Sequence, residues 1–399
     1  MYVLDFLKGP ANQSDGDGDR VSFEYRLLCS GELYNAKVET SDWRKSDVAC
    51  YLCGSPFTLL AVRNPLRHFP QELVLRFNAK RVTEQGGMAL ISFIPDEDIA
   101  RDVAALLSVF LRRLVTVAGK TRELHPNIKG SSMDALLDRP LPLVNSLNAV
   151  HWQAKPLGIT WYGEDRPEIT DHNPLPCGVD PHEVKESLSG LPDVACAQSF
   201  VLSARLYALG LMQMEHDISL SFHSLISAVE TIASAALKGY RPSEEDIASK
   251  KHSVATLAIK RFGLDSTAAR ELAIEAAKDI SWTAKRFFKF LVDNCGEDVW
   301  TEDDVFRIPP LYVPRRDQFE DALKQIYTAR GKLTHGGHAF PNSAAFGIHP
   351  LVPAKMMLEL HPTKPGFPPL VWFERVVNSA LRGFAKRSLA GGRQTAGDT

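Results

Sequence analysis

The chain has 399 residues, of which 44% are hydrophobic and 24% charged, and this composition is typical of a folded globular protein rather than a fibrous or disordered one. Lys and Arg total 46 against 48 Asp and Glu, so the net charge of -2 excludes a general basic attraction to nucleic acid and leaves only local basic patches. Because single domains usually run to about 100 to 200 residues, the length predicts two domains.

The N-terminus and the cysteines predict a cytoplasmic protein. The opening stretch MYVLDFLKGPANQSDGDGD turns polar and acidic after its first residues, so it lacks the apolar core of a signal peptide. No apolar run approaches the roughly 18 residues of a membrane span. The 6 cysteines are too few for a disulfide scaffold in a chain of this length. We therefore expect reduced thiols and no membrane partner.

Residues 1–190 are predicted to form a mixed α+β domain that senses or recruits a partner. Apolar and polar residues alternate in short runs at 20–40 and 72–82, which favours strands of a half-exposed sheet. A helix is predicted over 95–119, where an acidic first turn precedes apolar residues at helical spacing. Prolines and glycines are frequent over 121–195 and predict loops and short strands.

From about Ala195 the sequence changes to long helical patterns, which predict an all-helical domain over 191–390 and a polar tail over 391–399. Ser243 and Asp246 make a capping arrangement for a helix that reaches Phe262. Consecutive antiparallel helices of this length form a bundle, so the predicted fold class is α+β. The other helical patterns lie at 199–214, 217–237, 266–294, 316–335 and 369–387.

Two short strings lack the geometry that their chemistry requires. The stretch VAGKT at 117–121 is similar to the end of a phosphate-binding P-loop, but Leu114 occupies the place of the first glycine and a helix precedes it. In DGDGDR at 15–20, Arg20 replaces the turn glycine of a calcium loop, which favours an acidic turn.

The CxxC pair and the basic clusters leave alternatives open. Cys50 and Cys53 could belong to a zinc site only with a second ligand pair, for which Cys29 and His68 are the conceivable partners, and reduced thiols in a strand are the alternative. Two basic clusters are either polyanion sites or solvated faces. They consist of Arg63, Arg67, Arg76, Lys80 and Arg81, and of Lys285, Arg286 and Lys289.

One pattern in the helical half carries specific chemistry. Arg330 and His335 are separated by four residues in RGKLTH, near the end of a predicted helix and directly before Gly336. This pattern resembles the R-x(4-6)-H motif of HEPN domains. The stretch FHSLISAVETIAS at 222–234 is similar to their "ALE" helix, particularly in the ApeA-like branch of bacterial defence proteins. The resemblance covers residues 195–387, about half the chain.

The resemblance implies a helical domain that dimerises and cleaves RNA, with tRNA as one candidate, without metal or other cofactor. Histidine exchanges protons near neutral pH, and arginine is a permanently charged, bidentate phosphate ligand. His335 is therefore the expected general acid and base, Arg330 the phosphate clamp, and Glu230, from the "ALE" position, the group that orients Arg330. The expected products are 2′,3′-cyclic phosphate and 5′-hydroxyl ends. The expected substrate-binding residues are Lys332, Tyr327 and His338.

Other interpretations of the same residues stay open. The chain could be a non-catalytic HEPN module that binds nucleotide or RNA or scaffolds a partner protein, or a nucleotidyl-modified member of a toxin–antitoxin pair. Arg330 could be a salt-bridged surface residue, His335 a C-terminal helix cap, and Tyr327 a core residue. Glu230 could pair with a lysine instead. Gly331 departs from the polar residue common after the motif arginine and costs a helix about 1 kcal/mol relative to alanine.

Helix geometry constrains the motif further. At about 100° per residue, the five steps from Arg330 to His335 leave the two side chains about 140° apart on a straight helix. Either the helix ends before His335, which Gly336 and Gly337 would allow, or two copies complement each other across a two-fold axis. Both routes favour a homodimer or a higher assembly. Separately, we expect residues 1–190 to engage an activator or partner protein.

Overall fold

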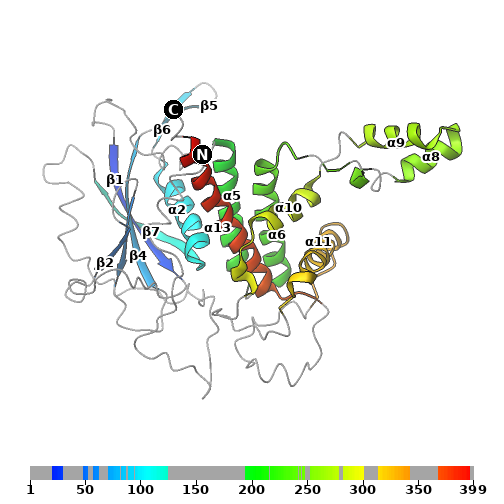
Figure 1. Ribbon diagram of the computed structural model, residues 1–399. Coiled ribbons are helices and arrows are strands. Elements are labelled where there is room, and N and C mark those ends of the chain that lie inside the picture. Colours follow the sequence, from blue (N-terminus) through cyan, green and yellow to red (C-terminus); the bar gives the residue numbers. More distant parts are fainter. Residues whose placement is uncertain are drawn as a thin grey trace, which may run out of the picture.

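The structure is a computed structural model with a β-sheet at one end and a helical bundle at the other (Figure 1). This arrangement confirms the predicted α+β fold class. The structure describes residues 20–29, 48–52, 57–62, 71–80, 82–86, 89–93, 95–124, 194–214, 216–240, 242–243, 245–247, 252–277, 282–300, 313–341 and 367–395.

The sheet is five-stranded, with its paired strands antiparallel and in the order β2-β3-β4-β1-β7. Its two longest neighbours, β1 and β4, pair over their whole length, from Arg20 opposite Lys80 to Cys29 opposite Gln71. A separate hairpin pairs β5 with β6. The strands are β1 (Arg20–Cys29), β2 (Val48–Leu52), β3 (Phe57–Val62), β4 (Gln71–Lys80), β5 (Val82–Gly86), β6 (Ala89–Phe93) and β7 (Val115–Leu124).

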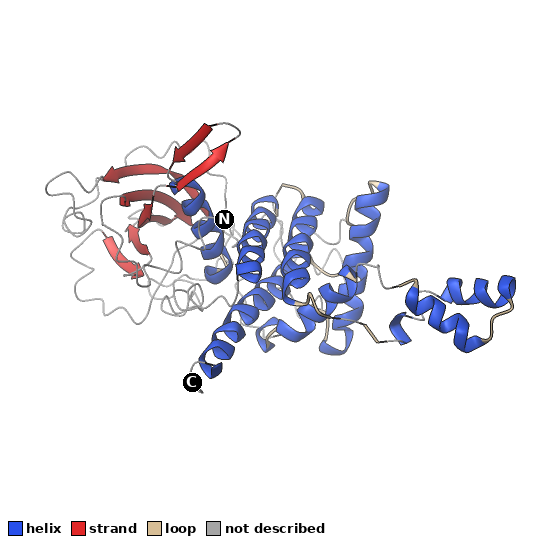
Figure 2. Ribbon diagram, turned by 90° about the horizontal axis from the view of Figure 1, so that it is seen from above, coloured by secondary structure: helices blue, strands red, loops and turns tan. Residues whose placement is uncertain are grey.

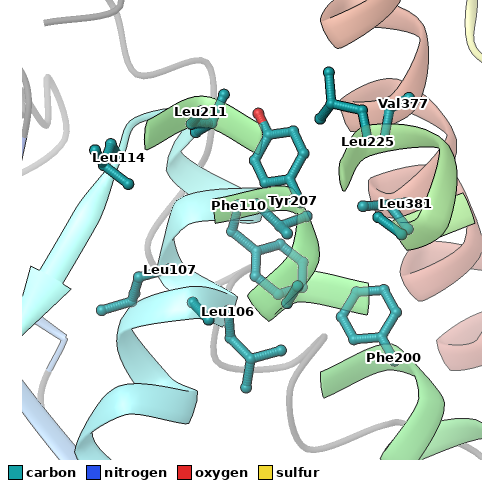
Figure 3. Close-up of a cluster of buried hydrophobic side chains, with 14 of the residues drawn as sticks. Leu106, Leu107, Phe110, Leu114, Phe200, Tyr207, Leu211, Leu225, Val377 and Leu381 are labelled. Atoms are coloured by element: carbon teal, nitrogen blue, oxygen red, sulfur yellow. The ribbon is translucent and has the colours of Figure 1, made fainter. Parts of the chain in front are cut away.

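The helix α2 (Asp96–Leu111) lies between the sheet and the bundle. It packs on β1 and β7 on one side and on α5 (Val194–Gln213) on the other. Phe110 of α2 and Phe200 of α5 lie together with leucines of both helices, so one apolar core runs from the sheet into the bundle (Figure 3). The predicted domain boundary near residue 190 falls outside the described residues and stays a prediction.

The predicted helix over 95–119 is too long. The helix ends at Leu111, Arg112 adopts the left-handed conformation with φ of 49°, and β7 begins at Val115. Val115, Thr116 and Val117 are β-branched, and such residues favour the extended backbone. The stretch VAGKT therefore lies inside a paired strand, which adds to the missing first glycine as a reason that it is not a P-loop.

The predicted helical bundle is present. Asp217 caps α6, since its side chain accepts a hydrogen bond from the backbone N–H of Leu220 at 2.9 Å. The helices α5 and α6 approach closely at Gly210, where an added Cβ would lie 2.8 Å from the Leu225 side chain. The bundle contains α5, α6 (Ile218–Ala236), α10 (Thr283–Asn294), α11 (Phe319–Gly336) and α13 (Leu370–Thr395), with short 3-10 turns at Glu297–Trp300 and Arg316–Gln318.

The predicted helical region over 266–294 is two helices, α9 (Ser266–Glu275) and α10. Before it, α8 (His252–Phe262) pairs with α9 in a hairpin that projects from the bundle (Figures 1 and 2). The expected capping contact is present, because the Ser243 hydroxyl accepts a hydrogen bond from the backbone N–H of Asp246 at 3.2 Å.

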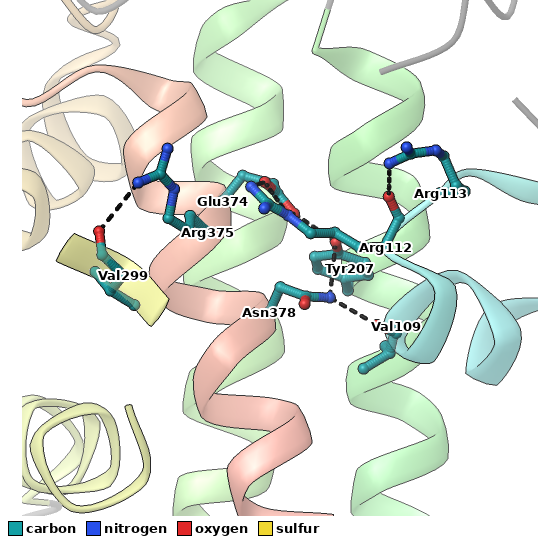
Figure 4. Close-up of polar contacts among 8 residues, drawn as sticks. All are labelled: Val109, Arg112, Arg113, Tyr207, Val299, Glu374, Arg375 and Asn378. Carbon is teal, nitrogen blue, oxygen red and sulfur yellow. Dashed lines mark hydrogen bonds and ion pairs between the residues drawn. The ribbon is translucent and has the colours of Figure 1, made fainter. Parts of the chain in front are cut away.

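A buried polar network ties α2 to α13 (Figure 4). Glu374 of α13 is fully buried and accepts hydrogen bonds from the Arg112 guanidinium at 2.7 Å and from the Tyr207 hydroxyl at 2.6 Å. The amide of Asn378 donates to the carbonyl oxygen of Val109 at 2.7 Å, which satisfies a free carbonyl at the end of α2. The link joins the sheet side of the molecule to the last helix of the bundle.

The prediction of an exposed basic cluster that includes Arg76 is wrong in part. Arg76 is buried against Glu24, with Nε and Oε2 2.8 Å apart and side chains 2% and 3% exposed, so it cannot bind a polyanion on the surface. The second cluster is exposed in part, but Lys285 pairs with Asp246 and Lys289 with Asp293. The remaining arginines of the first cluster, Arg63, Arg67 and Arg81, lie outside the described residues.

Two helices of the bundle bear on the predicted absence of a membrane span. Both α5 and α6 are long and apolar enough to cross a membrane by length and composition alone. Within their most apolar windows, 44% and 50% of the residues are buried inside the fold. Core helices of a bundle meet the same two criteria, so this pattern is weak support for a membrane location.

Candidate functional site

The predicted site residues lie on α11 and on the helix that faces it, α6. After α11 ends, Phe340 stacks on Phe222 near the start of α6, with ring centres 4.4 Å apart. The backbone N–H of Phe340 also donates to the Ser219 hydroxyl at 3.0 Å. The two helices therefore run antiparallel, and Glu230, near the end of α6, faces the middle of α11.

Glu230 holds two side chains of α11 at once. Its Oε2 lies 3.0 Å from a terminal nitrogen of Arg330, and its Oε1 accepts a hydrogen bond from the Tyr327 hydroxyl at 2.7 Å. The side chains of Arg330 and Glu230 are 24% and 13% exposed, so the ion pair is largely shielded from water. The expected pairing of Glu230 with Arg330 is thus present, and Arg330 is not a freely exposed surface residue.

The Arg330 guanidinium keeps donors for a ligand. Its Nε is buried and has no hydrogen-bond partner among the described residues. A guanidinium carries five N–H donors in a planar fork that suits phosphate oxygens. Glu230 therefore fixes the fork through one terminal nitrogen, and because Nε is buried, a bound anion would meet the remaining N–H groups of the terminal nitrogens.

Tyr327 belongs to the aromatic packing between α10 and α11. Its ring centre lies 5.0 Å from that of Phe287 and 5.6 Å from that of Phe288. Burial, followed by the hydrogen bond to Glu230 and the charge of that residue, raises the pKa of Tyr327 well above its usual value. The hydroxyl therefore stays a donor to Glu230, and the ring contacts favour the interpretation of Tyr327 as a core residue.

His335 lies on a different side of α11. The helix continues through His335 and ends at Gly336, and Gly337 then takes a left-handed conformation with φ of 67°. The first of the two routes, in which the helix ends before His335, is therefore wrong. The imidazole is exposed and hydrogen-bonds none of the described residues, whereas Arg330 faces α6. On this continuous helix, the side chains of Arg330 and His335 lie about 140° apart around the axis, as expected.

A shallow groove of about 750 Å³ runs beside the outer face of α11. Lys332 and His338, two of the expected substrate-binding residues, line it, whereas Tyr327 does not. His338 packs against the end of α11, since a Cβ on Gly336 would lie 2.8 Å from its imidazole. The lining residues are Lys324, Gln325, Thr328, Ala329, Lys332, His338, Ala339, Pro341 and Phe367.

His223 is a residue that the sequence analysis missed. It precedes Glu230 by seven positions on α6, which places the two side chains within about 20° of each other around the helix. Its Nδ1 is buried and has no hydrogen-bond partner among the described residues. The two-turn spacing from Glu230 is the signal that could have identified it.

Gly331→Ala is expected to stabilise the protein. A Cβ at this position meets no atom within 4 Å, and its φ is not among the positive values, so alanine gains helix propensity without strain. The gain is about 1 kcal/mol and is measured as a rise in the thermal unfolding midpoint. Gly337→Ala is the matched control, and its positive φ predicts a lower midpoint. A midpoint of Gly331→Ala below wild type would contradict the prediction.

The candidate zinc ligands and the acidic turn of residues 1–190 lie only in part within the described residues. Cys50 lies in β2 and Cys29 is a buried cysteine of β1, whereas Cys53, His68 and the acidic turn at 15–19 lie outside the described residues.

Comparison with protein-family models, with curated proteins and with solved structures finds no match for the chain. The likeness to HEPN domains therefore rests on the residues of α6 and α11 themselves.

Proposed function

We propose that the chain is a metal-independent endoribonuclease of the HEPN type that acts in bacterial defence against phage or as a toxin. The observation that carries this proposal is the shielded ion pair, 3.0 Å apart, between Glu230 of α6 and Arg330 of α11, the helix that also presents His335. A clamped arginine and an exposed histidine are the two groups that RNA cleavage by an internal nucleophile requires.

The chemistry assigns one role to each group. A His335 imidazole takes the proton of the ribose 2′-hydroxyl while the 2′-oxygen forms a bond to phosphorus. The bond from phosphorus to the 5′-oxygen breaks, and a protonated imidazole gives this oxygen its proton. Arg330 binds the non-bridging oxygens as charge builds on them. The products are a 2′,3′-cyclic phosphate and a 5′-hydroxyl.

A two-fold dimer resolves the orientation of these groups. On one α11, Arg330 faces α6 and His335 faces outward, so a single copy directs them to different sides. In a dimer, His335 of one subunit can meet the Arg330 phosphate site of the other. Each of the two composite sites then holds one Arg330 and one His335, and this histidine takes the 2′-hydroxyl proton and returns a proton to the 5′-oxygen.

A second candidate is a HEPN module that binds RNA or nucleotide without cleaving it, or that scaffolds a partner. The observation that favours binding is the groove on the outer face of α11, which presents Lys324, Lys332 and His338. Lysine and histidine side chains along a groove attract phosphate groups without any need for Arg330.

The test is RNA cleavage in excess EDTA. Purified protein is incubated with tRNA or total RNA beside Arg330→Ala, His335→Ala and two matched surface controls, Arg315→Ala and His252→Ala. We expect cleavage by wild type and both controls, with cyclic phosphate ends, and loss of cleavage in the two site variants.

Two outcomes count against the proposal. Cleavage that EDTA abolishes would overturn the metal-free mechanism and bring back Cys50, Cys53 and His338 as candidate ligands. Intact RNA that wild type still binds, with binding weakened by Lys332→Ala, would support the second candidate instead.

A further inference from the structure

The hairpin of α8 and α9 exposes an unusual amount of apolar side chain. Its large exposed residues lie within a short stretch of the chain, and Phe262 at the end of α8 is 70% exposed. Single exposed apolar residues are normal on a protein surface, but clusters mark interaction sites. The cluster comprises Leu257 (50%), Ile259 (45%), Phe262 (70%), Leu264 (37%) and Leu272 (42%).

The hairpin cannot owe much stability to its own contacts. The helices have 11 and 10 residues, and isolated helices shorter than about 12 to 15 residues are marginal in water. The fully buried residues of these helices are alanines: Ala258, Ala269 and Ala273. Among the described elements, α8 and α9 pack mainly on each other. A partner that covers the larger side chains would supply the burial that the hairpin lacks.

Position and charge indicate what this partner is. The hairpin projects from the end of the bundle that is remote from the sheet, and α11 lies at that same end (Figures 1 and 2). Exposed Lys260 and Arg261 make the tip of the hairpin basic. Exposed Glu320 and Asp321 make the first turn of α11 acidic. One copy therefore carries both halves of a charge-complementary contact with another copy.

We propose that the α8–α9 hairpin is a dimerisation arm that packs on the helical bundle of a second copy of the chain. Lys260 and Arg261 then face Glu320 and Asp321 of the partner subunit, and the exposed apolar side chains are buried beside them. Two arms exchanged across a two-fold axis would bring the α11 ends of both bundles together. The choice of a second copy rests in part on the proposed function, which needs two α11 helices at one site.

The test measures the solution mass of the full chain by light scattering over a range of concentrations. Wild type is expected to be a dimer. Reversal of the tip, Lys260→Glu with Arg261→Glu, is expected to raise the dimer dissociation constant at least about tenfold. Reversal of the acidic turn, Glu320→Lys with Asp321→Lys, should do the same. A chain that carries both reversals should regain the wild-type dissociation constant, which a merely unfolded arm would not do.

A second pair of variants tests the apolar contact. Phe262→Ser is expected to yield a monomer that still unfolds in one cooperative transition, and Leu202→Ser, a 43% exposed residue of α5, should leave the dimer intact. A monomeric wild type, or a dimer that survives both Phe262→Ser and the tip reversal, overturns the arm. RNA cleavage in EDTA is measured separately. A dimer that depends on the arm but has no ribonuclease activity would therefore overturn the proposed function and support the dimerisation arm. Ribonuclease activity in a protein whose mass the arm variants do not change would overturn the arm and leave the proposed function standing.

Discussion

Mixed dimers with Arg330→Ala in one subunit and His335→Ala in the other are expected to keep about half of the wild-type RNA cleavage. The His335→Ala homodimer is expected to lose about 10² to 10⁴-fold, the usual contribution of a general acid or base. The Arg330→Ala homodimer is expected to lose about 10² to 10³-fold, the usual cost of one donor that stabilises transition-state charge. In the mixed dimer, one of two composite sites retains both groups and the other has neither. Cleavage therefore returns although each subunit alone is defective.

The continuity of α11 is the reason that one site is expected to combine groups from two subunits. The helix runs from Phe319 to Gly336 without a break, so the side chain of Arg330 packs toward α6 and that of His335 projects into solvent. Glu230 holds the arginine in this direction with an oxygen 3.0 Å from its guanidinium. A phosphate bound by Arg330 of one subunit must therefore take its histidine from elsewhere.

The measurement uses two affinity tags and sequential purification of the co-expressed subunits. The control is a mixed dimer of Arg330→Ala with the double variant Arg330→Ala, His335→Ala, which contains no intact composite site and should stay inactive. If the first mixed dimer does not cleave RNA although wild type does so in EDTA, the Arg330 and His335 of one site belong to the same chain. His223, on the α6 side of the site, would then be the first residue to replace.

Local patterns in the sequence were enough to predict most elements of the fold. Apolar periodicity located α5, α6, α11 and α13, and the alternation of apolar and polar residues located β1 and β4. The end of α2 was missed because leucines and valines continue past Leu111 at helical spacing, although the backbone turns at Arg112. Pairs distant in sequence, such as Arg76 with Glu24, depend on strand register and cannot be read from composition.

The candidate site was predictable to a similar depth. The family resemblance predicted that Glu230 meets Arg330, and their separation of 3.0 Å agrees. The hydrogen bond from Tyr327 to Glu230 was not predicted, although Tyr327 precedes Arg330 by three positions and neighbours it on the helix. The orientation of His335 depended on where α11 ends, which two adjacent glycines left open in the sequence.

The buried network around Glu374 is the feature least visible in the sequence. Arg112 and Glu374 are 262 positions apart, yet their side chains lie 2.7 Å from each other. Burial and the neighbouring charge of Glu374 raise the pKa of Tyr207 well above its usual value, so its hydroxyl stays a donor to Glu374. Two positions before Glu374 on α13, Trp372 contacts Phe319 at the start of α11, with ring centres 6.0 Å apart. The network therefore fixes a helix that α11 touches at its first residue.

Glu374→Ala is accordingly expected to lower the free energy of unfolding by about 3 kcal/mol, because it removes the fully buried acceptor of the partly buried Arg112 guanidinium and of the buried Tyr207 hydroxyl. The loss is measured by urea unfolding. Glu97→Ala is the matched control, since the Glu97–Arg101 pair has side chains 62% and 61% exposed and should contribute no more than about 0.5 kcal/mol. Equal losses in the two variants would show that Glu374 does not hold α2 to α13. A large loss would show that this buried contact between α2 and α13 stabilises the whole fold.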